Sequence, residues 1–156
     1  QGEYQPVDLP KIEELEIKKV DLTEAIETRK SHRVYIEQPL TLEELTYLLW
    51  TTAGVKMVYE NRATIRTVPS AGARHPFETY LLINNVEGLE PGLYRYLALS
   101  HQIVAVDLRE GLKEAIMNLH LFGFHVALFR CVGGEDRYGN RLNNELKTIL
   151  GIISGL

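Results

Sequence analysis

Residues 41–50 read TLEELTYLLW, and they predict the clearest helix in the chain. Thr41 is a favoured N-cap residue, and Glu44 stands three positions later, which is the spacing of a capping box. Four leucines recur at the spacing of one apolar helical face: Leu42, Leu45, Leu48 and Leu49. Gly54 is a plausible end for the helix. The segment therefore predicts an amphipathic helix with one face against a core.

Downstream of this helix the pattern changes to that of strands. Three runs bounded by short polar turns predict an antiparallel meander: Glu78–Asn84, Gly92–Ala98 and Gln102–Leu108. The chain between Val55 and Ala73 shows no periodicity and is expected to be irregular. Further on, the pattern predicts a helix, a buried strand and a short last helix: Arg109–Leu121, His125–Val132 and Glu145–Ile153.

Upstream, residues 1–20 contain two prolines and mixed charges, which predicts an extended N-terminal arm. Asp21 and Glu24 have the spacing of a second capping box, and a helix is expected from there to about Lys30. A loop follows as far as Pro39. The predicted class is α+β, with a central antiparallel-rich sheet flanked by helices in a single domain over residues 21–156.

Composition limits the classes of function. With 156 residues, 45% hydrophobic and 24% charged, the chain fits one globular domain. A net charge of −4 argues against a nucleic-acid partner. No apolar run approaches the ~18–20 residues that a membrane span requires, and residues 1–20 lack the apolar core of a signal peptide. No membrane association is expected, and the expected location is cytoplasmic.

Metal chemistry is not expected either. Cys131 is the sole cysteine, so no intrachain disulfide can form. Its apolar neighbours favour a buried, inert thiol. His120, His125 and Cys131 match no common zinc spacing, and no acidic ligand lies close to them in sequence.

A first candidate site is the basic segment RKSHR at residues 29–33. Its arginines offer planar donor forks and its serine a hydroxyl, which is the kind of donor set that binds a phosphate. Taken alone, the segment is more simply explained as a solvated basic end of a helix, where the cations are stabilised by the helix dipole.

A second candidate is PSAGARHP at residues 69–76. Its small residues let a ligand approach the backbone closely, and its two prolines stiffen the loop. A tight connection leading into the strand at Glu78 explains the same residues equally well. His75 by itself is more often a structural hydrogen-bonding residue than a general acid.

The order of these segments resembles the nitroreductase superfamily, and most closely the branch similar to the dehydrogenase subunit of thiazole/oxazole peptide maturation. Four stretches carry the resemblance: RKSHRVY at 29–35, PLTLEELTYLLW at 39–50, PSAGARHP at 69–76 and VEGLEPGLYRY at 86–96. The combination of the basic segment with PSAG at this separation is fairly specific, whereas neither part is specific alone. The resemblance covers about residues 22–108.

The resemblance implies an α+β flavoprotein, a homodimer that holds FMN at the subunit interface. It places Arg29 and Ser31 at the flavin phosphate and ribityl chain, with Lys30 alongside. Arg33 would approach the pyrimidine end of the flavin, where a cation stabilises developing negative charge. The partner subunit would supply the loop of Pro69, Ser70, Ala71 and Gly72, on which the ring lies. The implied reaction carries hydride from NAD(P)H through flavin to an acceptor that is nitro/quinone-like or azoline-like.

The chain departs from the family after Leu108, which indicates a shortened C-terminal half. Residues 137–141 resemble a Tyr-Gly segment of the family on one alignment, whereas on another residues 122–150 resemble its later glycine-rich strand and helix. No catalytic residue is identified. The rival to an oxidoreductase is a flavin-binding or interaction protein of the same fold without efficient turnover. A non-flavin α+β module is a third interpretation.

Overall fold

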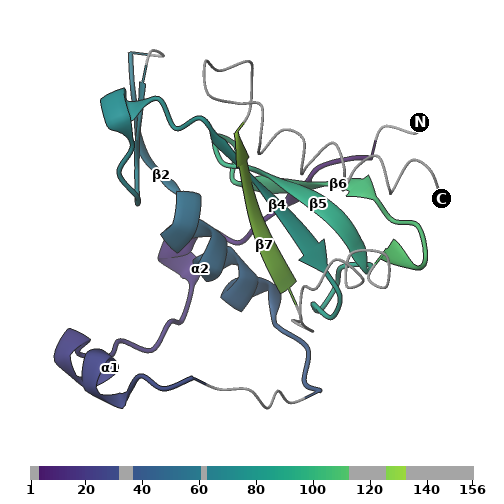
Figure 1. Cartoon of the computed structure of the whole chain (residues 1–156), viewed down its shortest axis with the longest axis horizontal. Helices are drawn as coiled ribbons and strands as arrows, with labels where there is room; N and C mark the ends of the chain where they lie inside the picture. The colour runs from purple at the N-terminus through teal and green to yellow at the C-terminus, as the bar shows by residue number, and fades with distance from the viewer. Residues whose placement is uncertain (1–3, 32–36, 61–62, 113–125, 133–156) are drawn as a thin grey trace.

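The computed structural model describes residues 4–31, 37–60 and 63–112, together with the backbone of the strand at 126–132. Within these ranges an antiparallel sheet forms the body of the molecule (Figure 1). The sheet order is β1 (Val7–Asp8), β6 (Gln102–Asp107), β5 (Gly92–Leu97), β4 (Phe77–Ile83) and β7 (Val126–Val132). The predicted α+β class, the three-stranded meander and the strand near His125–Val132 are therefore confirmed.

Helix α2 (Leu42–Ala53) begins as its sequence predicts. The Thr41 hydroxyl accepts a hydrogen bond from the Glu44 N–H at 3.2 Å, and the Glu44 carboxylate accepts one from the Thr41 N–H at 2.9 Å. The helix ends at Gly54, where a Cβ would lie 2.5 Å from the Trp50 carbonyl oxygen. Only glycine fits there, because the chain at this point lies so close to the backbone of the last helical turn that a Cβ has no room.

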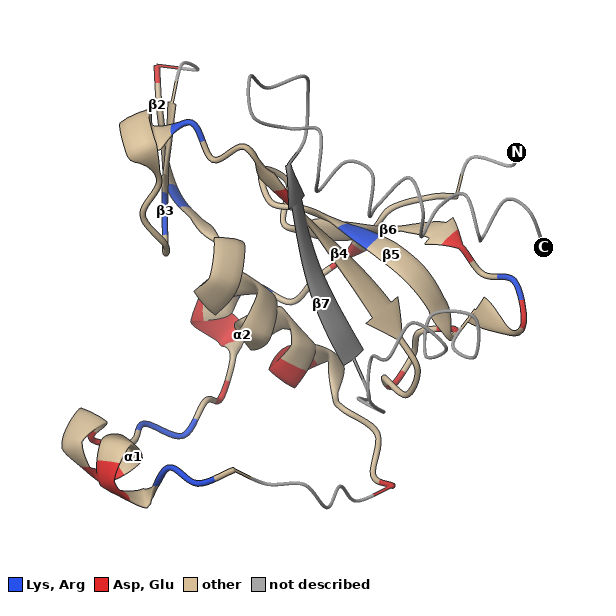
Figure 2. Cartoon of the chain, viewed as in Figure 1, with Lys and Arg blue, Asp and Glu red and all other residues tan. Residues whose placement is uncertain are grey.

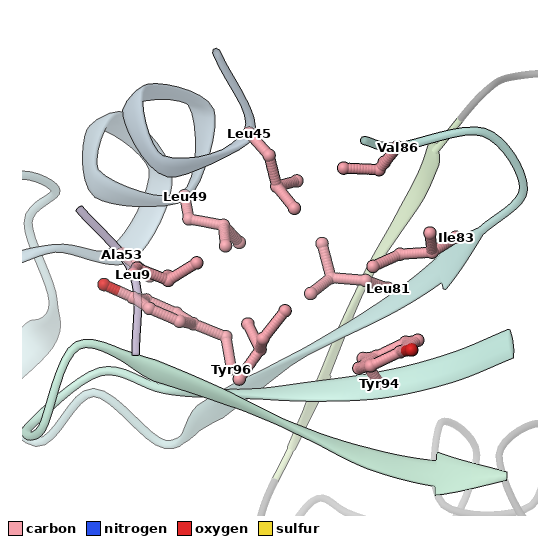
Figure 3. Close-up of a cluster of buried hydrophobic side chains, with 10 residues drawn as sticks. Leu9, Leu45, Leu49, Ala53, Leu81, Ile83, Val86, Tyr94 and Tyr96 are labelled. Carbon is pink, nitrogen blue, oxygen red and sulfur yellow. The ribbon is translucent and has the colours of Figure 1, made fainter. Parts of the chain in front are cut away.

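The core lies between α2 and one face of the sheet (Figure 3). Leu45 and Leu49 of α2 are 1% and 0% exposed, and they point toward Leu81 of β4 and Tyr96 of β5 (Figure 3). Ten buried residues make up the cluster: Leu9, Leu45, Leu49, Ala53, Leu81, Ile83, Val86, Tyr94, Tyr96 and Ile103. Thr79 shares the parity of Leu81 and therefore faces α2.

The opposite face of the sheet is partly polar. Glu78 alternates with Thr79 along β4, and its carboxylate accepts a hydrogen bond from Arg95 Nη2 of β5 at 2.8 Å. Both side chains of this ion pair are more than a third exposed. The alternation of apolar and polar residues thus determines which face of β4 and β5 packs against α2.

The N-terminal arm is extended, and it joins the sheet as the edge strand β1. Val7 pairs with Ile103 and Asp8 with Gln102, in antiparallel register with β6. Leu9 follows into the core at 7% exposure, and its N–H donates to the His101 carbonyl at 3.3 Å. A 3-10 turn at Ile12–Glu14 comes next.

The prediction of irregular chain between Val55 and Ala73 is wrong for its first part. Strands β2 (Val55–Tyr59) and β3 (Ala63–Arg66) form an antiparallel hairpin that projects from the body. The β-branched and aromatic residues of these strands favour extended chain. Strand β2 is exposed along nearly its whole length, so buried and exposed residues do not alternate along it. The sequence therefore shows no alternation of apolar and polar residues there. A 3-10 turn at Ala71–Ala73 follows.

Helix α1 (Leu22–Thr28) confirms the predicted helix near Asp21. The Asp21 carboxylate accepts hydrogen bonds from the N–H groups of Thr23 and Glu24, at 2.9 and 3.3 Å. Every residue of α1 is exposed, and Figure 1 shows the helix set apart from the sheet. Its N-terminus is therefore capped, while none of its side chains is buried within the described chain.

Several predicted segments lie outside the described residues. They are most of the helix at 109–121, the segment at 137–141, the helix at 145–153, and the side chains of His120, His125 and Cys131. Among the helices that the structure describes, none has the length and apolarity that crossing a membrane requires.

Replacing Leu49 by alanine tests the core. The side chain is fully buried, so Leu49→Ala is expected to lower the free energy of unfolding by about 2–5 kcal/mol. Its neighbour Leu48 is 50% exposed, and Leu48→Ala is the matched control with an expected loss below about 1 kcal/mol. Urea unfolding followed by far-ultraviolet circular dichroism measures both. Equal losses in the two variants would contradict the packing of α2 described above.

Candidate functional site

The basic segment directly follows α1. Arg29 is the C-cap residue of the helix, and Arg29, Lys30 and Ser31 are all exposed. Lys18 and Lys19 precede the helix, so positive side chains flank α1 at both ends (Figure 2). His32 and Arg33 lie outside the described residues. Three of the four predicted residues of this segment are thus placed on one accessible turn.

The PSAGARHP loop is held in an unusual backbone conformation. Gly72 has a φ of +62°, and the non-glycine residues Ala73 and His75 have φ values of +51° and +43°. Left-handed conformations at residues with side chains are energetically costly, and such strain tends to cluster at functional sites.

Ser70 holds this strained loop together from within. Its hydroxyl accepts a hydrogen bond from the His75 N–H at 3.0 Å, and its carbonyl accepts one from the Ala73 N–H at 3.0 Å. Pro69, Ala71 and Gly72 are exposed around it. The loop therefore presents a stiff, small-residue surface on which a flat ligand can lie.

The two predicted parts of the site do not meet within the chain. In the view of Figure 1, α1 and the hairpin β2–β3 lie at opposite ends of the same side of the molecule. The Ala71–Ala73 turn lies against β3, so the PSAGARHP loop belongs to the hairpin end. The basic turn and the loop therefore lie apart within one copy of the chain.

A cavity of about 410 Å³ lies beside the same loop, and no sequence pattern predicted it. Its lining includes Ala53 from the end of α2, Arg66 from β3, His75 from the loop and the neighbouring Phe77 and Thr79 of β4. These residues are far apart in sequence and meet because α2, the hairpin and β4 converge there.

Thr79 is the unusual member of this lining. It is 2% exposed, and its hydroxyl has no hydrogen-bond partner. Thr46, which is also buried, donates to the Leu42 carbonyl at 2.7 Å. An unsatisfied buried hydroxyl costs about 1–3 kcal/mol, which the surrounding packing must offset.

The described residues around the cavity include two arginines and one acidic residue. Arg66 lines it, and Arg95 lines it from the opposite side of β5 while paired with Glu78. Burial raises the pKa of Tyr96 to about 12, against a smaller lowering effect of the positive charge on Arg66.

A second cavity, of about 450 Å³, lies elsewhere, beside the end of β4 and the segment after β6. None of the described residues that line it is a predicted site residue. In the described part of the chain, no group of three histidine, cysteine or acidic side chains is arranged to hold a metal ion.

Comparison with known proteins supplies an independent observation. The model of the nitroreductase family matches residues 26–144. A Methanocaldococcus jannaschii protein described as a nitroreductase is 37% identical over 105 residues, which cover 67% of this chain and 48% of that protein. The trifolitoxin-processing protein of Rhizobium leguminosarum bv. trifolii is 34% identical over 65 residues, covering 41% of this chain and 17% of that protein.

A solved structure described as a nitroreductase, from Ralstonia eutropha, shares the fold with a TM-score of 0.60 at 23% identity. The alignment covers 96% of this chain and 68% of that one. The chain spans about half the length of its Methanocaldococcus jannaschii relative. The family match extends over most of the chain and includes both the basic segment and the PSAGARHP loop, and the chain therefore belongs to the nitroreductase family.

Proposed function

We propose that this chain is an FMN-dependent oxidoreductase that carries hydride from NAD(P)H through the flavin to an acceptor of nitro/quinone-like or azoline-like type. Membership of the nitroreductase family supports oxidoreductase chemistry in general. The observation that carries the proposal is the strained, exposed loop at residues 69–76 together with the exposed basic turn at residues 29–31. A cytoplasmic location fits this function and is part of the proposal.

The residues present fit the two ends of FMN. A phosphate requires several donors at one accessible place, and Arg29, Lys30 and Ser31 are consecutive and exposed. A flavin ring requires a flat surface without bulky side chains, and Ala71 and Gly72 are exposed on a loop that Ser70 stiffens. The bound FMN supplies the two-electron chemistry, while the chain binds and orients it.

We further propose a homodimer, because the two parts of the site lie apart on the same side of the molecule. A two-fold axis between them would place α1 of each copy against the hairpin β2–β3 of the other (Figure 1). One such axis completes two sites at once, each with a basic turn from one copy and a loop from its partner.

Exposed apolar side chains occur at both proposed contact regions. On α1, Leu22 and Ile26 are 72% and 66% exposed, and on the hairpin Met57 and Ile65 are 53% and 50% exposed. A single two-stranded hairpin is marginally stable by itself in water. A partner that covers these residues would stabilise both projecting elements, and a second copy supplies matching surfaces reciprocally.

The flavin phosphate site is tested by Arg29→Ala. Removing one charge-assisted donor is expected to weaken FMN binding about 10- to 100-fold. Quenching of flavin fluorescence during titration measures the dissociation constant. Arg109→Ala is the matched control, since Arg109 bonds Asp107 at 2.7 Å and belongs to neither part of the proposed site. Equal affinity in both variants and the original chain would remove Arg29 from the site.

A mixing experiment tests the shared site. Arg29→Ala disables the basic turn, and Ala71→Trp blocks the loop at an exposed position. When the two variants are unfolded together and refolded, mixed dimers should regain about one quarter of the original FMN sites, since half of the dimers are mixed and each carries one intact site. Fluorescence titration counts the sites. No regain above the separate variants would mean that each site lies within a single copy.

Anaerobic reduction separates an enzyme from a binding protein. The flavin-loaded chain is expected to bleach near its absorbance maximum when NADH or NADPH is added, and Arg33→Ala is expected to bleach more slowly because a cation near the flavin pyrimidine stabilises the reduced form. Stopped-flow absorbance gives the rates. A loaded chain that fails to bleach with either donor would favour the rival function, a flavin-binding protein without turnover.

A further inference from the structure

We propose that the guanidinium of Arg74 lies against the flavin ring and stabilises its reduced form, so that Arg74 raises the reduction potential of bound FMN. The role of Arg74 rests on the proposed function, because it takes the PSAGARHP loop as the surface on which the ring lies. Three observations support it: the place of the side chain over Gly72, the stiff backbone on both sides of it, and its unneutralised charge.

The side chain of Arg74 lies over the small-residue part of the loop. A Cβ built on Gly72 would lie 3.7 Å from Arg74 Nε and 3.8 Å from Arg74 Cγ, which is ordinary van der Waals distance. Gly72 and its neighbours Ala71 and Ala73 are exposed and carry at most a methyl group. A guanidinium is planar and stacks well on aromatic rings. A ring that lies on this surface therefore comes within reach of the Arg74 guanidinium.

Ser70 fixes the backbone on both sides of Arg74. Its carbonyl accepts a hydrogen bond from the Ala73 N–H and its hydroxyl accepts one from the His75 N–H, both at 3.0 Å. Arg74 has helical dihedrals, with φ −77° and ψ −26°, between two residues with left-handed φ values. The chain at Arg74 therefore has little freedom, and a ligand that meets this side chain loses less entropy because the loop is already ordered.

The charge of Arg74 is available to a ligand. Arg95 and Arg109 pair with Glu78 and Asp107, at 2.8 and 2.7 Å. Among the residues that the structure describes, no acidic side chain pairs with Arg74, which is exposed. The phosphate of FMN is proposed to lie at the basic turn, which lies apart from this loop in one copy of the chain. The ring is thus the part of FMN that Arg74 meets.

A cation beside the ring favours the reduced state. Hydride transfer oxidises NAD(P)H to NAD(P)⁺ and adds two electrons and one proton to the ring, which gains one negative charge. A guanidinium in contact with the ring stabilises this charge and interacts only weakly with the neutral oxidised ring. Solvent screening keeps the effect modest, because Arg74 is exposed. We expect Arg74 to favour reduced over oxidised FMN about three- to tenfold, which corresponds to about 15–30 mV for a two-electron couple.

The midpoint potential of the FMN-loaded chain tests this role. Anaerobic reduction at neutral pH in the presence of a reference dye, followed by absorbance, measures it. Arg74→Gln removes the charge and should lower the midpoint potential by about 15–30 mV. Arg74→Lys keeps the charge, and its potential should lie closer to that of the original chain than to that of Arg74→Gln. An unchanged potential in Arg74→Gln, or equal losses in both variants, overturns the proposal.

Two further variants separate the effect on the ring from net charge and from phosphate binding. Arg109→Gln removes an arginine that pairs with Asp107 outside the proposed site, and it should leave the midpoint potential unchanged. Arg29→Ala removes a proposed phosphate donor, so it should weaken oxidised and reduced FMN equally and lower affinity without changing the potential. A fall in potential in either variant as large as in Arg74→Gln overturns the contact between Arg74 and the ring.

Folding and flavin binding are measured beside the potential. Arg74→Gln should leave the thermal unfolding midpoint of the flavin-free chain unchanged, because the side chain is exposed and pairs with no described acidic residue. A lowered unfolding midpoint would show a structural role and overturn the proposal. Failure of the original chain to bind FMN refutes the proposed function and this role together. Normal FMN binding with equal potentials in the original chain and Arg74→Gln refutes the role of Arg74 alone.

Discussion

The packing of Leu45 and Leu49 against Leu81 and Tyr96 is the contact on which the rest of the structure depends. It joins the one long described helix to strands β4 and β5 of the meander, and both leucines are essentially free of solvent. Because α2 is held on this face, its C-terminal end meets the beginning of the hairpin β2–β3 at Gly54. The position of the PSAGARHP loop then follows from the short connection after β3.

This core stabilises the sheet and α2 but leaves the proposed flavin-binding residues outside it. Helix α1 is exposed along its whole length, and the hairpin is exposed along most of β2. Segments that carry binding residues are commonly loops supported by a rigid scaffold. In this chain they carry exposed apolar side chains as well, and surface of that kind is typical of a contact with another molecule.

Two energetic costs are concentrated beside the loop. Ala73 and His75 adopt left-handed backbone conformations, and Thr79 buries a hydroxyl without a partner. Each costs on the order of 1–3 kcal/mol, and the core must offset both. Departures from low-energy structure are expected where a site is preorganised for a ligand. His75 and Thr79 both line the cavity beside the loop, so the two costs lie close together in space.

The sequence by itself determined the strongly periodic elements: α2 with its capping box, α1 with its Asp21 cap, and the strands β4, β5 and β6. These elements depend on the spacing of residues along the chain, so the sequence pattern is enough to predict them. It also identified the basic turn and the PSAGARHP loop as candidates. The sequence did not predict the hairpin, because a two-stranded ribbon exposed on both faces needs no alternation of apolar and polar residues. Only the tertiary structure decided that the two candidate segments lie apart and that Arg66, His75 and Thr79 share a cavity, because those facts depend on how α2 seats on the sheet.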